Sequence, residues 1–243
     1  MSRSVYIGFD PREIDAFLVA RQSLKSRATG PISVYGLDQR PLIRKGLYWR
    51  ETRVRDGLMW DTISDAPMST EFAISRFLVP HLARERRLVD NAGWALFIDA
   101  DVMVRGNISR LFDLADETKA VMCVKHDFRP PEGVKMDGQA QTQYARKNWS
   151  SVMLINCNHP SNEKLTVEMV NELPGRDLHR FCWLEDEEIG SLPVTWNWLV
   201  GHSDPGVMGP QLVHYTDGIP RMPGYMDAPF AEEWYAELEA AVA

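Results

Sequence analysis

The sequence predicts an α/β domain built on a mainly parallel sheet that is flanked by helices and followed by a small C-terminal extension. Short apolar runs rich in β-branched residues are typical of buried strands, and amphipathic segments lie between them. The N-terminal segment alternates strand, helix and strand, which joins two parallel strands by a right-handed crossover. The 243 residues, 44% of them hydrophobic, suffice for one core or for one core with a smaller lobe.

The first strand–helix–strand unit is expected at the N-terminus. Val5–Phe9 is uncharged and consists mainly of β-branched and aromatic residues, as in a buried strand. Asp10, Pro11 and Glu13 supply three helix-start signals: a capping side chain, a residue suited to the first helical position, and an acid that can close a capping box. Ile32–Leu37 is the second strand. One face of the intervening helix should be formed by Ile14, Phe17, Leu18, Arg21 and Leu24.

The downstream segments continue this alternation of strands and helices. Residues 38–68 are mixed in composition and are expected to be irregular, or to form a short helix, as a loop over a site. Residues 127–147 predict a second long loop, and loops of this length in compact domains are usually functional or disordered. Ser69 and Thr70 can cap the next helix, which should bend near Pro80. The remaining helices are expected at 69–82, 161–173 and 230–242, and the remaining strands at 94–98, 102–104, 120–124, 152–155 and 211–215.

Charge and composition exclude several classes of protein. The chain carries 27 basic and 34 acidic residues, a balance of 27 − 34 = −7, which argues against a nucleic-acid partner because such proteins carry basic patches. No apolar run approaches the roughly 20 residues of a membrane helix, and the N-terminus lacks the pattern of a signal peptide. Cys123, Cys157 and Cys182 are scattered without a metal-binding spacing. We therefore expect a cytoplasmic protein.

The most informative segment is Leu96–Val104, in which an apolar strand ends in Asp99, Ala100 and Asp101. Residues two apart on a strand point to the same side, so both carboxylates can face one ligand. Ligands of open α/β sheets bind beyond the carboxyl ends of the strands. Carboxylate oxygens suit Mg²⁺ or Mn²⁺ and leave coordination positions for a diphosphate. A turn with aspartates at its polar corner is the alternative, but the apolar flanks favour a functional site.

Five segments, taken in order, resemble glycosyltransferase family 8, whose members have the GT-A fold and a D-x-D motif. These segments are residues 69–80, 99–104, 150–156, 184–189 and 213–218. The resemblance implies a GT-A-type, Rossmann-like, mainly parallel twisted sheet flanked by helices. It also implies a single domain over residues 1–243, made of a nucleotide-binding half at about 1–105, an acceptor and catalytic half at about 106–225, and a C-terminal helix at about 228–243.

The resemblance also implies a reaction and its site residues. Family members of this type transfer a sugar, with retention of anomeric configuration, from a nucleotide-diphospho-sugar, here expected to be a UDP-sugar. The acceptor would be a saccharide, a lipid or a protein. Mn²⁺ or Mg²⁺ would be held by Asp99, Asp101 and His214. The donor would be bound by Asp10, Arg76, Asp99, Ala100, Asp101, Gly218 and Arg221, and the catalytic carboxylates would be Asp186, Glu187 and Glu188.

Three segments depart from the family pattern. The family's N-S-G-V is Trp149–Val152 in this chain. Its D-Q-D is Asp186–Glu188, with glutamate at the second and third positions. Its late H-x-x-G-x-x-K pattern is shifted, because Gly218 comes one residue late and Arg221 is the only nearby cation. These departures concern the acceptor and the diphosphate more than the metal. The candidate acceptor residues are Trp149, Ser150 and His202.

The negative charge of the chain has a candidate location. Without Asp99, Asp101 and the four acids of residues 185–188, the balance becomes 27 − 28 = −1. We expect the excess carboxylates to line a site that a divalent cation and an anionic donor complete, because a bound cation inverts the local electrostatics.

Two other functions fit parts of the sequence. The altered segments at 149–152 and 186–188 are compatible with a non-catalytic nucleotide-sugar-binding protein of the same fold. A haloacid-dehalogenase-type phosphatase also carries a strand-end D-x-D, but that family places it early and follows it with Gly-Thr or a similar pair, whereas Val102 and Met103 follow here. The sequence does not indicate the oligomeric state.

Overall fold

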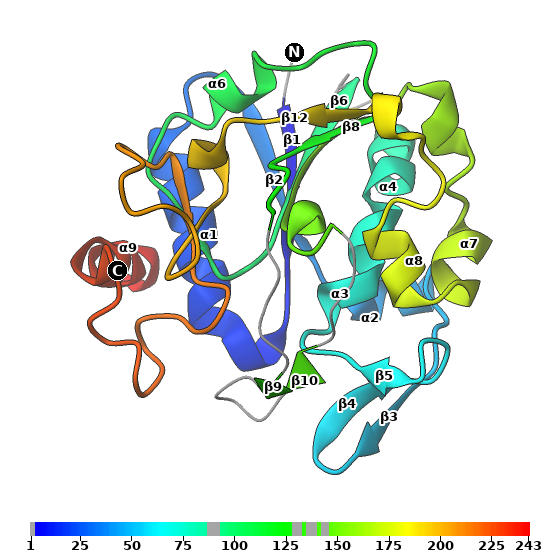
Figure 1. Ribbon diagram of the computed structural model, residues 1–243, viewed down its shortest axis with the longest axis horizontal. Helices are drawn as coiled ribbons and strands as arrows, with labels where there is room; N and C mark the ends of the chain where they lie inside the picture. Colours follow the sequence, from blue (N-terminus) through cyan, green and yellow to red (C-terminus); the bar gives the residue numbers. More distant parts are fainter. Residues whose placement is uncertain (1–2, 87–92, 128–132, 135–139, 142–145) are drawn as a thin grey trace.

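A six-stranded sheet forms the centre of the computed structural model, which describes residues 3–86, 93–127, 133–134, 140–141 and 146–243 (Figure 1). In spatial order its strands are β12 (Ile189–Ser191), β8 (Val121–Cys123), β11 (Val152–Asn156), β6 (Trp94–Ile98), β1 (Arg3–Gly8) and β2 (Ile32–Leu37). β1 is parallel to β2 and β6, and β8 is parallel to β12, while β11 is antiparallel to both of its neighbours. The predicted mainly parallel α/β fold is therefore confirmed.

Both faces of this sheet are buried, as the uncharged strand sequences require. Along β1, Val5 and Ile7 belong to one hydrophobic cluster and Tyr6 belongs to the other. The residues of β6 alternate in the same way, with Phe97 on the Tyr6 side and Leu96 on the opposite side. Because successive side chains of a strand point to opposite faces, this alternation places helices on both sides of the sheet.

The helix of the first strand–helix–strand unit begins later than predicted and buries a different face. Asp10 caps a 3-10 turn, η1 (Pro11–Glu13), through the Arg12 N–H at 2.9 Å, and α1 (Ile14–Arg27) follows. Ile14 is 42% exposed, so its assignment to the buried face was wrong. Leu24 of the predicted face is buried, and Phe17 and Leu18 pack partly buried against the core. The small residues beside them let α1 lie close to β7 and to the C-terminal helix α9 (Ala231–Val242). The buried residues of α1 are Ala16, Val19, Ala20, Ser23 and Leu24.

A second, three-stranded sheet brings the C-terminal part of the chain to the centre of the molecule. It consists of β13 (Trp198–Leu199), β14 (Leu212–His214) and β7 (Val102–Val104). β14 runs antiparallel to β7, with His214 opposite Val102. Beyond this pair, the Tyr215 N–H donates to the Asp101 carbonyl at 2.9 Å. This pairing fixes the end of β14 beside the predicted D-x-D segment.

Residues 38–68 are more regular than predicted. They form a short helix, α2 (Gln39–Arg44), and a small antiparallel sheet of β3 (Thr52–Arg55), β4 (Leu58–Asp61) and β5 (Ala66–Pro67) (Figure 1). We call this small sheet, with the turns that join its strands, the hairpin lobe. Asp56 and Gly57 join β3 to β4 with φ of 53° and 78°. An Asp-Gly pair with both residues left-handed is the preferred hairpin turn, so this dipeptide was a signal that the prediction missed.

The predicted helix at 69–82 is interrupted. It consists of α3 (Phe72–Ser75), the 3-10 turn η2 (Arg76–Leu78) and α4 (Val79–Glu85), and Pro80 lies in the first turn of α4, where proline is favoured. α3 has no side-chain cap, so the predicted cap at Ser69 or Thr70 was wrong. The predicted helix at 161–173 is likewise split into η4 (Pro160–Glu163) and α7 (Val167–Glu172).

The remaining elements are short, apart from α9, which packs on α1 through Trp234 and Leu238. Most of the predicted loop at 127–147 lies outside the described residues. Within its described part, β9 (Gly133–Val134) and β10 (Ala140–Gln141) form an antiparallel pair. Among the helices that the structure describes, none is long and apolar enough to cross a membrane. The other helical elements are α6 (Ser109–Phe112), η3 (Trp149–Ser151), α8 (Gly175–His179), η5 (Asp186–Glu188) and η6 (Val194–Trp196).

Candidate metal and donor site

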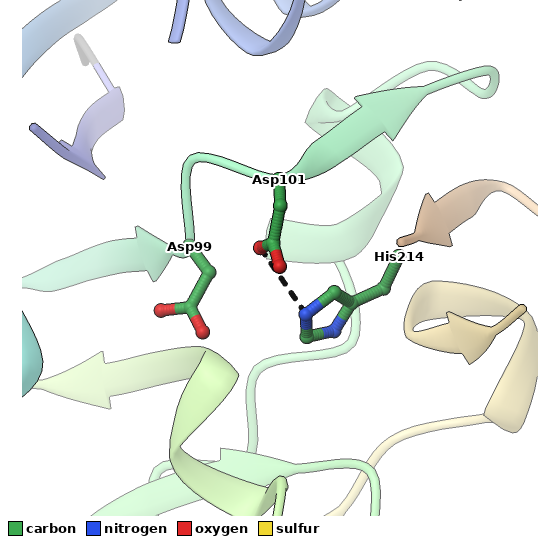
Figure 2. A group of neighbouring side chains, drawn as sticks. All are labelled: Asp99, Asp101 and His214. Atoms are coloured by element: carbon green, nitrogen blue, oxygen red, sulfur yellow. Dashed lines mark ion pairs between the residues drawn. The ribbon is translucent and has the colours of Figure 1, made fainter. Parts of the chain in front are cut away.

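Asp99, Asp101 and His214 converge at one point between the two sheets (Figure 2). Each offers one ligand atom, and these atoms all lie within 4.8 Å of one another. Asp99 follows β6, Asp101 precedes β7, and His214 ends β14, so the three come from strand ends that meet. His214 Nε2 lies 3.2 Å from Asp101 Oδ1. We call these three residues the acidic cluster.

The backbone around the acidic cluster is fixed on both sides. The Asp99 N–H donates to the Ser151 carbonyl at 2.9 Å, while the Asp101 carbonyl is held by Tyr215. Ala100, between the two aspartates, is fully buried, so its side chain packs in the core and contributes no ligand atom. The predicted donor-binding role of Ala100 can therefore involve only its backbone.

Asn197 orients the imidazole of the acidic cluster. Its Oδ1 lies 2.9 Å from His214 Nδ1, and its Nδ2 donates to Ser151 Oγ at 2.9 Å. Because the amide nitrogen donates, Oδ1 accepts, and His214 must carry a hydrogen on Nδ1. Nε2 is then the atom that faces Asp101. A ring nitrogen oriented by a hydrogen bond at the other nitrogen is typical of metal-binding histidines, a role that was not predicted for Asn197.

Arg76, predicted to bind the donor, lies directly behind Asp99. Its Nη1 is 2.6 Å from Asp99 Oδ1 and 3.0 Å from the Ser150 carbonyl, and its Nε donates to the Ala73 carbonyl at 2.9 Å. The side chain of Arg76 is only 6% exposed. Burial, opposed by the charge of Arg76 and assisted by that of Asp101, raises the pKa of Asp99 to about 6. Arg76 thus stabilises the charged form of Asp99.

Two more acids lie at the amino end of α1. Asp10 is fully buried and accepts hydrogen bonds from Arg12 and from the Glu71 N–H. Burial alone would raise the pKa of Asp10, but these hydrogen bonds outweigh it and lower the pKa. Burial, together with the charges of Asp101 and Asp10, raises the pKa of Glu13 to about 8. The charge interaction of Glu13 with Asp101 extends the acidic region toward the first strand, although only a helix-capping role was predicted for Glu13.

A cavity of about 530 Å³ begins at the acidic cluster and ends at the hairpin lobe. Its wall passes Arg76 and Ser150 on the way to Ser64 in the lobe and His179 in α8. Ser150, a predicted acceptor residue, places its Oγ 2.7 Å from His179 Nδ1. Burial and the nearby arginines hold the pKa of His179 well below its usual value, so this imidazole is neutral at physiological pH.

The predicted catalytic carboxylates are not among the described residues that line this cavity. The Asp186 side chain is 81% exposed and forms an ion pair with Arg146. Glu187 is exposed as well. The Glu188 carboxylate is bonded by Ser161 Oγ and by the Glu185 N–H, as in a capping box. The acids of residues 185–188 are therefore outside the described wall of the cavity at the acidic cluster, and the catalytic role of Asp186–Glu188 remains a prediction.

The other predicted residues also lie outside the described wall of the main cavity. A Cβ on Gly218 would lie 2.6 Å from the Tyr225 ring, so glycine is needed there for packing. Arg221 forms an ion pair with Asp15 in α1, with Nη1 lying 3.1 Å from Oδ2. Trp149 donates from Nε1 to the His126 carbonyl at 2.9 Å. His202 lines a second cavity of about 380 Å³, and its Nε2 lies 2.6 Å from an Asp217 carboxylate oxygen.

Comparison with known proteins gives a family. No protein-family model matches the chain. Protein CDI of Arabidopsis thaliana is 45% identical over 240 residues, which cover 97% of this chain and 85% of that protein. The chain belongs to the Protein CDI family. This membership carries no activity with it, because the name of the relative states none.

Solved structures similar to this chain show its fold. The WbbM bifunctional glycosyltransferase superposes with a TM-score of 0.63 at 14% identity, and the glycosyltransferase GlyE of Streptococcus pneumoniae TIGR4 with 0.60 at 15%. Galactosyltransferase LgtC superposes with a TM-score of 0.59 at 17% sequence identity. Each match covers 98% of this chain, which spans 49% of WbbM, 60% of GlyE and 95% of LgtC. These identities are low, so the likeness shows the fold, which is of the predicted GT-A type.

Proposed function

We propose that the chain is a metal-dependent glycosyltransferase that uses a nucleotide-diphospho-sugar, expected to be a UDP-sugar, and that retains the anomeric configuration. The observation that carries this proposal is the convergence of Asp99, Asp101 and His214 at the mouth of a cavity, in a chain with the GT-A fold. The acceptor, whether saccharide, lipid or protein, is left open. The predicted assignment to glycosyltransferase family 8 belongs to the same proposal.

The residues of the acidic cluster fit Mn²⁺ or Mg²⁺. Two carboxylates and one imidazole form a mixed oxygen and nitrogen donor set with ligand atoms within 4.8 Å, which suits these cations. When bound, the cation would neutralise the charge that develops on the departing diphosphate. Arg76 would hold Asp99 in its charged form, and Asn197 would keep His214 Nε2 directed at the ion. Asp10, Gly218 and Arg221 are proposed to lie at the remainder of the donor, and Asp186–Glu188 beside the transferred sugar.

The proposal is tested by thermal shift with a panel of nucleotide sugars, with and without Mn²⁺. We expect one donor to raise the melting temperature only when Mn²⁺ is present. Asp101→Asn should remove this metal-dependent shift and the turnover of that donor while preserving the fold. Asp113→Asn serves as the matched control, because Asp113 is 65% exposed and pairs with Arg3 away from the cluster. Undiminished Mn²⁺-dependent turnover in Asp101→Asn would exclude the metal assignment.

A non-catalytic nucleotide-sugar-binding protein is the second candidate function. It is favoured by one observation, namely that Asp186, Glu187 and Glu188 are absent from the described wall of the cavity. Binding of a nucleotide sugar without hydrolysis, and without transfer to a wide panel of acceptors, would support this function over the first. The phosphatase alternative gains no support from the glycosyltransferase fold.

A further inference from the structure

Positive charge is concentrated in α2, β3 and the loop between them. Residues 39–55, which we call the basic segment, contain six basic residues and one acid, a balance of 6 − 1 = +5. The remainder of the chain amounts to 21 − 33 = −12. All the cations of the basic segment are exposed except Arg50, which pairs with Asp61 in the interior. Such an asymmetry within an acidic protein indicates an anionic partner for this segment.

Three of the exposed cations are not neutralised by a carboxylate of the described chain. Arg44, Lys45 and Arg55 form no ion pair with any residue that the structure describes. The other two, Arg40 and Arg53, are each paired with a carboxylate two positions away. Exposed pairs of this kind contribute little to stability, and an unpaired exposed cation contributes less. The charge of the basic segment is therefore not explained by the stability of the fold.

Large apolar side chains are interspersed with these cations. Ile43 is 54% exposed, Trp49 is 49% exposed and Val54 is 81% exposed. They lie in α2, in the loop that follows it and in β3, and they line neither of the two cavities. Single exposed apolar residues are common. Three of them among unpaired cations, however, have the composition of a surface that binds at the boundary between lipid and water.

β3 is the outer strand of the hairpin lobe, and the described chain contributes no strand to its second edge. All of its residues are exposed. Arg53 is opposite Trp60 in the register, and the guanidinium of Arg55 lies over the Trp60 ring, 4.6 Å from its centroid. A short edge strand that carries charged side chains is protected from pairing with another strand. A second copy of β3 would also bring arginines against arginines, so self-association at this edge is unfavourable.

We propose that the basic segment binds to the surface of an anionic lipid bilayer. Its cations would contact the headgroups, and its three exposed apolar side chains would enter the boundary between headgroups and acyl chains, where tryptophan is enriched. A bilayer accommodates separate apolar side chains without a groove. A nucleic-acid strand would gain little from Ile43 and Val54, because such strands bind by stacking on aromatic rings.

The charge of the remaining chain gives this contact a direction. An anionic bilayer attracts the basic segment and repels the acidic remainder, so the bound molecule is held with the segment toward the lipid. The main cavity ends at the hairpin lobe, to which β3 belongs, and this end of the cavity would lie beside the membrane. The membrane contact does not depend on the proposed function, since it concerns a surface outside the acidic cluster.

The test measures sedimentation of the full chain with vesicles of phosphatidylcholine alone and of phosphatidylcholine mixed equally with phosphatidylglycerol. We expect the wild-type protein to sediment with the anionic vesicles only, and less at high salt, which screens the charges. Arg44→Glu combined with Lys45→Glu should weaken this binding at least about 30-fold, because each basic residue near an anionic surface strengthens binding about fivefold. Circular dichroism confirms that the variant is folded.

Two controls match these changes elsewhere on the surface. Arg21→Glu combined with Lys25→Glu makes the same change of charge at exposed positions of α1, away from the hairpin lobe (Figure 1), and should leave vesicle binding nearly unchanged. Val54→Ser should weaken binding about tenfold through the loss of apolar contact. Met208→Ser, at a position that is 86% exposed, is the control for Val54→Ser and should have little effect.

Several results would overturn the proposal. One is equal binding of the wild-type protein to both kinds of vesicle, or binding to neither. Another is an equal loss of binding in the two double variants, which would show that only the net charge matters. Binding of polyglutamate or single-stranded DNA without binding of vesicles would assign the basic segment to a different anionic partner. None of these results bears on the proposed function, because the assay contains neither Mn²⁺ nor a nucleotide sugar.

Discussion

At the scale of single residues, the hydrogen bond between Asn197 and His214 is the contact that most directly shapes the acidic cluster. Asn197 is fully buried, and its 2.9 Å contact with Nδ1 leaves Nε2 to face Asp101. Residues that orient a metal-binding histidine in this way usually contribute about 10- to 100-fold to metal affinity. We expect Asn197→Ala to weaken Mn²⁺ binding by that factor, measured as free Mn²⁺ by electron paramagnetic resonance.

The control for Asn197→Ala is another buried asparagine. Asn162 is fully buried and its Nδ2 donates to the Ala120 and Asn156 carbonyls, both at 2.8 Å. Asn162→Ala should destabilise the fold by a comparable amount without changing Mn²⁺ affinity. If both variants lose Mn²⁺ binding equally, the effect of Asn197 is one of general stability, and its role in orienting His214 is wrong.

At the scale of elements, the hairpin lobe is attached to the body of the molecule through Arg50. Its guanidinium contacts both Asp61 oxygens, at 2.7 and 2.6 Å, and the Val170 and Leu173 carbonyls at the end of α7. Both side chains of this ion pair are nearly fully buried. Removing one partner of such a pair leaves an uncompensated buried charge, which costs about 3–5 kcal/mol.

We therefore expect Arg50→Met to lower the free energy of unfolding by about 3–5 kcal/mol in urea denaturation. Arg53→Met is the matched control in the same lobe, because the Arg53–Glu51 pair is 69% and 60% exposed and should contribute less than about 1 kcal/mol. Replacing both members of the buried pair, Arg50→Met with Asp61→Leu, should recover part of the loss. Equal effects of Arg50→Met and Arg53→Met would contradict the anchoring role.

The elements also show which parts of the fold can be predicted from the sequence. Strands with uninterrupted apolar sequences, such as Trp94–Ile98, were predicted at their observed bounds because burial on both faces leaves a continuous pattern. The hairpin lobe was missed because β3 is exposed along its whole length and carries no apolar alternation. In the site, the D-x-D spacing predicted two neighbouring carboxylates. The role of Asn197 was not predicted, since its contact with His214 depends on the tertiary packing of distant segments.

At the scale of the whole molecule, the net charge of −7 is distributed more widely than predicted. Asp99 and Asp101 lie together, with Asp10 and Glu13 nearby, but residues 185–187 are exposed and Glu188 is half-buried at η5, outside the described wall of the cavity. Only part of the excess acidity therefore belongs to the acidic cluster. The concentration of carboxylates there has a consequence for stability, because charges of the same sign that are buried together are unfavourable without a cation.

Glu13 should make the metal-free protein less stable at alkaline pH. Its pKa rises from the usual 4.5 to about 8 on folding, so the folded state holds a proton that the unfolded chain has lost. The contribution is fully present below about pH 4.5 and is lost as the pH rises through about 8. We expect the free energy of unfolding, measured in urea, to fall less between pH 5 and pH 8 in Glu13→Gln than in the wild-type protein.

The comparison of Glu13→Gln with the wild-type protein isolates this residue, because Asp99 and the other acids are common to both. Glu163→Gln, at an exposed position of η4, is the control and should leave the pH dependence of stability unchanged. A pH dependence that is the same in wild type and Glu13→Gln would show that Glu13 is ionised in the folded protein throughout this range.

The pairing of β14 with β7 brings together two segments that are 214 − 101 = 113 positions apart in the chain. A cation held by Asp101 and His214 would therefore act as a reversible cross-link across nearly half of the polypeptide. Closing so long a loop restricts the unfolded chain far more than the folded one, and metal binding of this kind contributes directly to folding. Chelation would then loosen the connection between the N-terminal and C-terminal halves, and the protein's resistance to proteolysis would depend on the supply of the metal.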